Sequence, residues 1–334
     1  MLLNYILKRL FQLIPLTIAV SALIFFIIKL PPGDYLTTWI QQQELAGMHV
    51  DQTTIDNMQR MYGLDRPDIE QYFFWVSNII FRGDFGRSMM ISNLPVTQLI
   101  GERIGWTMAI SLSTLIISFL VAIPAGIYSA VKKYSVGDYF ITFIGFIGMA
   151  VPGFLIALVL VYLIFVNTGV AFVGLFSSAY AQAPWSIAKF MDMLPRFLLC
   201  VAIIGLSSTA GTIRGMRAMT LDELEKQYVT TARSKGLEER KMLWKYPIRM
   251  ALNPICSTIG WVLPSLISGE IVVSIVLNMP TIGPLMRNAL IAQDMYLAGS
   301  MLLFTAVLTI VGTLLSDILL SIMDPRIKFG GVSD

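Results

Sequence analysis

Residues 228–254 read YVTTARSKGLEERKMLWKYPIRMALNP, and this basic stretch decides how the rest of the chain is interpreted. It contains six lysines and arginines, in a chain of 334 residues of which 56% are hydrophobic and only 13% are charged. Apolar runs lie on both sides of it. A dense polar segment between apolar runs indicates a loop that lies outside a membrane and has a structure of its own.

The local pattern predicts two short helices joined by a glycine turn. Helical character extends over residues 221–234, and acidic residues in the first turns favour the helix dipole. Gly236 can end this helix, because the position after a C-cap often needs a left-handed backbone that glycine adopts without steric cost. A second helix restarts at Leu237, and Pro247 and Pro254 turn the chain back toward the bilayer. Such a compact unit is suited to docking a partner.

The composition identifies an all-α polytopic membrane protein. The mean hydropathy is +0.72, and several apolar runs reach the roughly 18–20 residues needed to cross a hydrocarbon core. We expect the first run to be a retained helix and not a cleaved signal. Six transmembrane helices are predicted, at about 10–30, 106–131, 139–166, 197–213, 255–277 and 297–323.

Charge placement predicts the orientation. The segment 214–254 has nine basic and five acidic residues, and basic residues also flank the first run and the C-terminal tail (Lys8, Arg9, Arg326, Lys328). The segment 31–105 has five basic and nine acidic residues. The positive-inside rule therefore places both termini and 214–254 in the cytoplasm. We divide the chain into 1–30, an external segment 31–105 with short amphipathic helices, and a core 106–334.

The sequence offers little material for catalysis. It has one histidine and two cysteines, and no GxxxxGK[ST] phosphate loop. We expect no catalytic residues, no metal site and no cofactor, and nothing indicates nucleic acid. If the chain uses ATP, another subunit must bind it.

The loop and three further stretches resemble one family. Thr230, Thr231 and Ala232 precede Gly236 as in the cytoplasmic EAA loop of ABC importer permeases, and KGLEERKMLWKYPIRMALNP is similar to the peptide/nickel branch. The other three stretches are KRLFQLIPLTIAVSALIFFIIKLPPGDY, YGLDRPDIEQYFFW with GDFGRSM, and DILLSIMDPRIKFG. Four such pieces in the same order resemble this branch along almost the whole chain.

The resemblance implies an inner-membrane permease with the type I importer fold, in the plasma membrane of a bacterium or archaeon. A second permease subunit, usually non-identical, would complete the channel. Two ABC ATPase subunits would bind the cytoplasmic loops, and an external solute-binding protein would deliver substrate. The coupling loop would consist of Thr230, Thr231, Ala232, Lys235, Gly236 and Leu237, seated in a groove of an ATPase subunit.

A polar stripe on the fifth run is our candidate for the transport pathway. A carboxylate well inside a membrane helix is costly, so Glu270 should face the bundle interior, a watery path or a partner subunit. Ser274 lies four residues on, near the same helical face. We predict a pathway lining of Ser265, Ser268, Glu270 and Ser274, with a purely structural carboxylate as the alternative.

The substrate and two rival functions stay open at this point. Relatives of the peptide branch usually have glutamate where this chain has Ser274, so oligosaccharides are retained beside oligopeptides. An ion-coupled secondary carrier is the alternative function, but it should show paired mid-membrane charges and inverted repeats, and the sequence shows neither. An intramembrane hydrolase would need a convincing nucleophile and base.

Overall fold

The computed structural model describes the backbone of residues 2–91 and 93–323. It describes their side chains except for 2–10, 256–261, 263, 264, 267, 315–317 and 319–323. The described residues form thirteen α-helices and no strand, which confirms the all-α prediction for this part of the chain. The tail residues Arg326 and Lys328, used above for orientation, lie outside it.

The helices divide into two compact units that do not follow the linear boundaries expected from the sequence. The smaller unit comprises Leu7–Trp106 and Thr281–Leu308, so the late segment 281–308 groups with the external segment. Its helices are α1 (Leu2–Lys29, from residue 7), α2 (Tyr35–Leu45), α3 (Gln52–Tyr62), α4 (Asp68–Arg82), α12 (Ile282–Ile291), and the first parts of α5 (Val96–Val131) and α13 (Met295–Met323).

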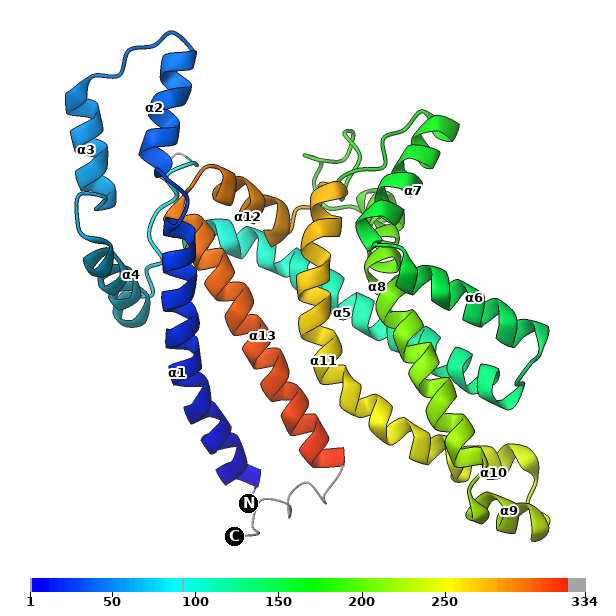
Figure 1. Cartoon of the computed structure of the whole chain (residues 1–334). Helices are drawn as coiled ribbons and strands as arrows, with labels where there is room; N and C mark the ends of the chain where they lie inside the picture. Colours follow the sequence, from blue (N-terminus) through cyan, green and yellow to red (C-terminus); the bar gives the residue numbers. More distant parts are fainter. Residues whose placement is uncertain (1, 92, 324–334) are drawn as a thin grey trace. The chain divides into compact units, whose positions relative to one another are not determined.

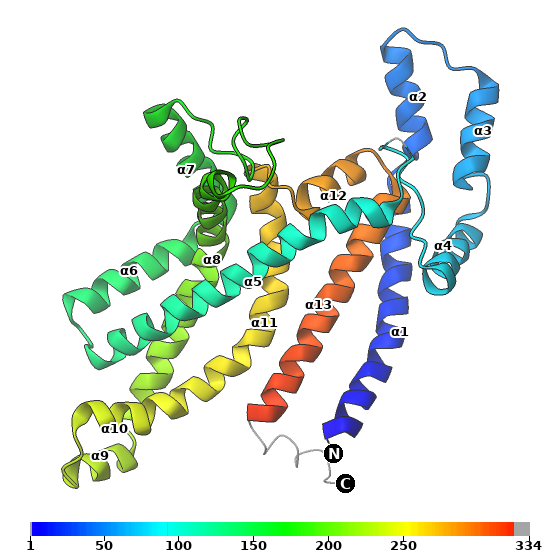
Figure 2. The same cartoon turned by 180° about the vertical axis from the view of Figure 1, so that it is seen from behind.

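The larger unit comprises Met1–Ile6, Thr107–Pro280 and Thr309–Asp334. Helix α8 (Ile187–Leu224) is central and packs against α6 (Val136–Ala150), α7 (Gly153–Thr168) and α11 (Pro247–Val276). Two short helices, α9 (Gln227–Ser234) and α10 (Glu239–Lys245), lie together where α8 ends and α11 begins (Figures 1 and 2). The predicted docking loop is therefore carried by the two helices with the most extensive mutual packing.

The third apolar run is not one continuous span. Within the described residues, α1, α5, α8 and α13 are each long and apolar enough to cross a membrane, whereas α6 and α7 meet at an angle of 104°. The break follows from Pro152, since a residue before proline avoids the helical region and Val151 has φ −97° and ψ 125°. Counting the bent pair as one span gives up to five, and the six-span topology stays a prediction because the middle of α11 is only partly described.

The remaining boundaries differ mainly at helix ends. The fourth run was expected to be short, but α8 continues in both directions through polar and charged residues, because a helix pairs its backbone groups beyond the apolar region as well. The two amphipathic stretches of the external segment form α3 and α4 as predicted. Helices α2 and α12 were not predicted, since neither has a long apolar run.

Asp294 organises the smaller unit. This aspartate is fully buried and its Oδ2 accepts hydrogen bonds from Ser88 Oγ (2.7 Å) and Met90 N (3.0 Å), while its Oδ1 accepts from Leu297 N (3.1 Å). Nearby, Tyr296 Oη donates to the carbonyl of Tyr62 at 2.9 Å. The carboxylate thus caps the first turn of α13 and fastens the loop after α4 to it.

Close helix contact in the larger unit depends on Gly126. A Cβ placed on this residue of α5 would lie 2.6 Å from Met216 Cβ and 2.9 Å from the carbonyl oxygen of Ile213, both on α8. Small residues at helix interfaces are the means by which membrane helices approach one another closely. One of the two close atoms is a backbone carbonyl oxygen, which cannot move aside unless α8 shifts.

We therefore predict that Gly126→Ala lowers the thermal denaturation midpoint of the purified chain in detergent, because overpacking costs about 1–3 kcal/mol. Gly105→Ala, on the same helix with no atom within 4 Å of its added Cβ, is the matched control and should be neutral or slightly stabilising. Equal midpoints for the two variants would contradict the interpretation.

Candidate functional site

The docking loop has a small apolar core of its own. Val229 and Ala232 of α9 are buried against Met242 of α10, and Leu237 and Tyr246 pack around them. The single helix predicted over 221–234 is wrong, because the chain is extended at the residue before α9 (φ −71°, ψ 146°) and α9 starts anew. This break lets α9 turn its buried face toward α10.

Gly236 ends α9 as predicted. It has φ +74° and its N–H donates to the carbonyl of Arg233 at 2.9 Å, while Leu237 N donates to the carbonyl of Ala232 at 3.3 Å. These two bonds form a Schellman motif, which satisfies the last carbonyls of α9 and brings Leu237 onto the apolar core. No atom lies within 4 Å of an added Cβ at Gly236, so the backbone conformation alone requires glycine within this chain.

An ion pair joins the two helices across the glycine turn. Arg233 Nη2 lies 2.7 Å from Glu239 Oε1, and Arg233 Nε lies 3.2 Å from Glu239 Oε2. The guanidinium lowers the pKa of Glu239 against a smaller opposing effect of burial. Both side chains are largely exposed, so the pair contributes at most about 1 kcal/mol to stability. It favours the angle between α9 and α10 without determining it.

The predicted coupling residues separate into an inner and an outer set. Ala232 is buried and Leu237 is half-buried, so these two hold the loop together. Thr230, Thr231, Lys235 and Gly236 are exposed. Thr231 Oγ1 donates back to the carbonyl of Gln227 at 2.9 Å, so its hydroxyl hydrogen is used within α9. The outer set forms a surface of small side chains with one cation, suited to close contact with a partner.

A partly buried ion pair holds the C-terminal part of α8 to the start of α6, and sequence reasoning missed it. Asp138 at the start of α6 is 3% exposed and accepts from Arg217 Nε and Nη2, both at 2.9 Å, and from Tyr134 N at 2.9 Å. Ser129 Oγ also donates to Asp138. Bidentate pairs of this kind are geometrically specific. Ser135 caps α6 by accepting from Asp138 N, and this Ser-x-x-acid pattern was the available sequence signal.

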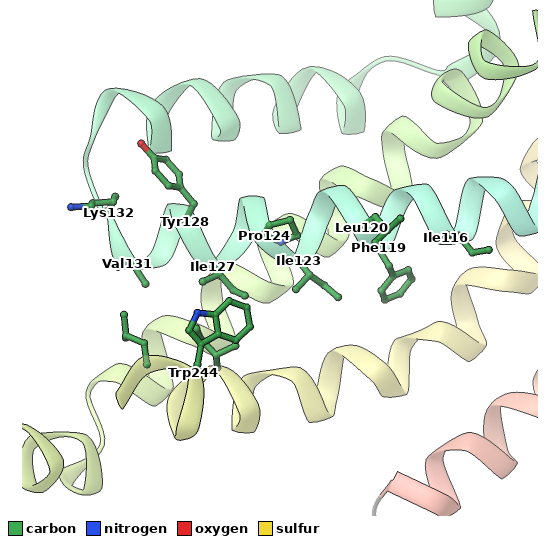
Figure 3. Close-up of a pocket in the computed structure, with 12 residues that line it drawn as sticks. Ile116, Phe119, Leu120, Ile123, Pro124, Ile127, Tyr128, Val131, Lys132 and Trp244 are labelled. Carbon is green, nitrogen blue, oxygen red and sulfur yellow. The ribbon is translucent and has the colours of Figure 1, made fainter. Parts of the chain in front are cut away.

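An apolar groove of about 770 Å³ adjoins the loop within the larger unit. Its walls come from α5, α10 and α11, and Figure 3 shows Trp244 of α10 reaching toward Ile127 of α5. Tyr128 near the C-terminal end of α5 and Lys132 just after it also line the groove, and Figure 3 shows the Tyr128 side chain pointing away from Trp244. A groove of this composition in a membrane protein accommodates lipid chains or an apolar helix, so we do not assign it to the transported solute.

A second hollow, of about 450 Å³, lies between α7, α8 and α11. Its polar lining consists of three serines, Ser207 and Ser208 of α8 and Ser265 of α11, and two glycines open it further, Gly153 and Gly269. Only Ser265 belongs to the predicted pathway set. The serines of α8 were visible in the sequence as polar residues within an apolar run, but their position opposite α11 was not.

The other predicted pathway residues lie elsewhere on α11. Glu270 is 1% exposed and Ser274 is fully buried, with Ser274 Oγ donating to the carbonyl of Ile271 at 2.9 Å. Ser268 is exposed and does not line the hollow. Positions four residues apart share a helical face, so Ser265 with Gly269 and Glu270 with Ser274 form two separate pairs. The structure does not bring the predicted stripe together.

The described residues contain no group of three or more histidine, cysteine, aspartate or glutamate side chains that could hold a metal ion. The arrangement can dock a partner at the α9–α10 loop and admit a polar solute beside Ser207, Ser208 and Ser265. The α9–α10 loop connects α8 to α11, and the three serines of the hollow lie on these two helices.

Comparison with known proteins now identifies the family. The model of the binding-protein-dependent transport system inner membrane component matches residues 122–329. The chain is 33% identical to the oligopeptide transport system permease protein AppB of Bacillus subtilis, over 97% of this chain and 99% of that protein. It is 30% identical to a putative peptide permease protein of Brucella ovis, over 98% and 99%. The glutathione transport system permease protein GsiC of Shigella boydii is 28% identical, over 98% of this chain and 100% of that protein.

The resemblance to ABC importer permeases of the peptide/nickel branch is thereby confirmed. The chain belongs to the family of binding-protein-dependent transport system inner membrane components.

Proposed function

We propose that the chain is a permease subunit of an ATP-driven importer that takes up peptides delivered by an external solute-binding protein. The main support for this proposal is the α9–α10 loop, in which Val229, Ala232 and Met242 are buried and small side chains are exposed to solvent. A loop with its own apolar core and an exposed face of small residues is suited to close contact with a partner protein. A second permease subunit and two ABC ATPase subunits complete the proposed assembly.

The loop can transmit movement because its attachments are stiff. The apolar core makes α9 and α10 move together, and the Asp138–Arg217 pair holds α8 to the turn between α5 and α6. Displacing α9 by an ATPase subunit therefore displaces the ends of α8 and α11. We propose that Thr230, Thr231, Lys235 and Gly236 contact the ATPase, whereas Ala232 and Leu237 act through the loop core.

The hollow between α7, α8 and α11 is our candidate for part of the pathway. Ser208 Oγ and Ser265 Oγ donate to carbonyls of their own helices, and the three serine oxygens can accept hydrogen bonds from the N–H groups of a peptide. The relatives named above are described as oligopeptide, peptide and glutathione permeases, which favours a peptide over an oligosaccharide. Glu270 and Ser274, buried beside this surface, would then determine how α11 packs.

The topology is proposed together with the function. Six spans with both termini in the cytoplasm place the α9–α10 loop on the side where ATPase subunits reside, and segment 31–105 on the side of the solute-binding protein. Helices α2 and α3 of that segment pack on each other, and Leu36 anchors α2 in the smaller unit. We propose that they form a docking surface for the binding protein.

The first prediction from the proposed function concerns coupling. Gly236→Asp should lower substrate-stimulated ATP hydrolysis of the assembled complex at least tenfold, because a side chain is strained at φ +74° and obstructs the docked face. Gly169→Asp is the matched control, since Gly169 also has positive φ (+69°) and open space but lies after α7. Asparagine adopts the left-handed backbone more readily than aspartate and has a similar size. Gly236→Asn therefore keeps the obstruction of the docked face with less backbone strain. Stimulation equal to that of the Gly169 control would sink the coupling assignment.

The second prediction concerns the hollow. Ser265→Leu should reduce peptide uptake several-fold in reconstituted vesicles while leaving complex assembly intact, because the larger side chain fills the space between α8 and α11. Ser268→Leu adds the same side chain to the same helix outside the hollow and should transport normally. Comparable uptake by the two variants would remove the hollow from the pathway.

The third prediction concerns α2 and α3. Replacing residues 40–60 by a short glycine–serine linker retains the buried Leu36 and Tyr62, so membrane insertion should be unchanged. Peptide uptake driven by the solute-binding protein should fall at least tenfold. Failure of the shortened chain to insert would mean that the segment is a structural cap, and undiminished uptake would mean that it does not dock the binding protein.

A further inference from the structure

The smaller unit contains a polar pocket that the proposed transport function does not use. Its volume is about 380 Å³, and its walls come from the end of α3, from α4, from the loop that follows α4, and from Tyr296. The polar lining includes Asn78, Arg82, Arg87 and Asn93, and the aromatic lining includes Trp75. The loop is fastened below by the buried Asp294, so the walls are held in place.

Two guanidinium groups face this pocket without neutralisation. Arg82 is exposed and has no hydrogen-bond or ion-pair partner among the described residues. Arg87 Nη1 donates to the carbonyl of Asn93 at 3.1 Å, which orients the guanidinium and leaves its other N–H groups available. Asp84 also lines the pocket, but its Oδ1 accepts from Gly86 N at 2.9 Å, and it forms no ion pair with either arginine.

The pocket wall also carries polar atoms without partners. Trp75 is only 2% exposed, and its Nε1 has no acceptor among the described residues. The Oδ1 atom of Asn93 is buried and likewise lacks a donor within the described part of the chain. Buried polar groups are normally hydrogen-bonded, so a ligand in this pocket can supply an acceptor to Trp75 Nε1 and a donor to Asn93 Oδ1.

The geometry points to a binding site for a carboxylate group attached to an amide-containing ligand. The carboxylate pairs with Arg82 and Arg87, because the planar guanidinium matches carboxylate geometry. An adjacent peptide unit offers a carbonyl to Trp75 Nε1 and an N–H to Asn93 Oδ1. Asp84 on the same wall disfavours a doubly charged anion such as phosphate. The volume admits a group the size of one or two amino-acid residues, from an acidic side chain on a docked protein or from the C-terminus of a peptide.

Nuclear magnetic resonance of the purified full chain in detergent tests this site. The chain has six tryptophans, so ¹⁵N-indole labelling gives a small set of signals, and Trp75→Phe identifies the one from Trp75. Three blocked tripeptides serve as probes: Ac-Ala-Glu-Ala-NH₂ carries only a side-chain carboxylate, Ac-Ala-Ala-Ala-OH only a terminal one, and Ac-Ala-Ala-Ala-NH₂ neither. A saturable shift of the Trp75 signal is expected with a carboxylate probe and not with the neutral one, and the more effective carboxylate identifies the source.

Arg82→Gln should raise the Kd of the effective carboxylate probe at least tenfold, because it removes one of the two guanidinium groups that pair with the carboxylate, and Arg82 is exposed. Arg60→Gln removes the same charge from α3 outside the pocket and should bind as the unmodified chain does. The proposal is overturned if no carboxylate probe shifts the Trp75 signal, if the neutral peptide shifts it equally, or if Arg82→Gln and Arg60→Gln bind alike. Because binding to the isolated chain is measured, the result does not depend on transport.

Discussion

The need to pair every backbone polar group in an apolar surrounding underlies the rest of this structure. Irregular backbone is not stable against lipid, so the long apolar runs of the described residues are mainly helical, and the longer non-helical stretches, between α4 and α5 and between α7 and α8, lie outside these runs. Within the third apolar run the helix is interrupted at Val151 and Pro152, and Gly153 beside this break lines the hollow next to α8 and α11. Non-helical backbone at membrane depth is tolerated where protein or a cavity covers it, so the break and the hollow belong together.

The apolar surrounding also explains why glycines lie at the contacts between α8 and its neighbouring helices. Lipid tails are as apolar as leucine, so membrane helices gain stability by close packing and not by leaving water. A Cβ at Gly126, Gly148 or Gly205 would come within 3.0 Å of an atom on a neighbouring helix. The Asp138–Arg217 pair then adds a directional contact at the end of α8, where apolar packing alone would permit sliding.

The sequence was sufficient for features that depend on local chemistry. Gly236 ends α9 because few residues other than glycine accept a left-handed backbone, and that preference is visible without a fold. The break before α9 was not predictable, since it exists to bring Val229 and Ala232 onto Met242, a tertiary contact. The arrangement of the proposed pathway residues was not predictable for a related reason. Ser265 and Glu270 are close in sequence, but which face of α11 lines the hollow depends on where α8 packs.

The α9–α10 loop connects α8 to α11, and the serines of the hollow lie on these same two helices. Ser207 and Ser208 lie on the helix that enters the loop, and Ser265 and Gly269 lie on the helix that leaves it. The apolar core holds α9 and α10 together, so under the coupling role proposed above a force on the exposed threonines would reach both α8 and α11. Helices α8 and α11 are in extensive contact, and closely packed cores are bistable and not continuously deformable. The two serine-bearing walls of the hollow, on α8 and α11, are therefore not expected to move independently when a partner displaces the loop.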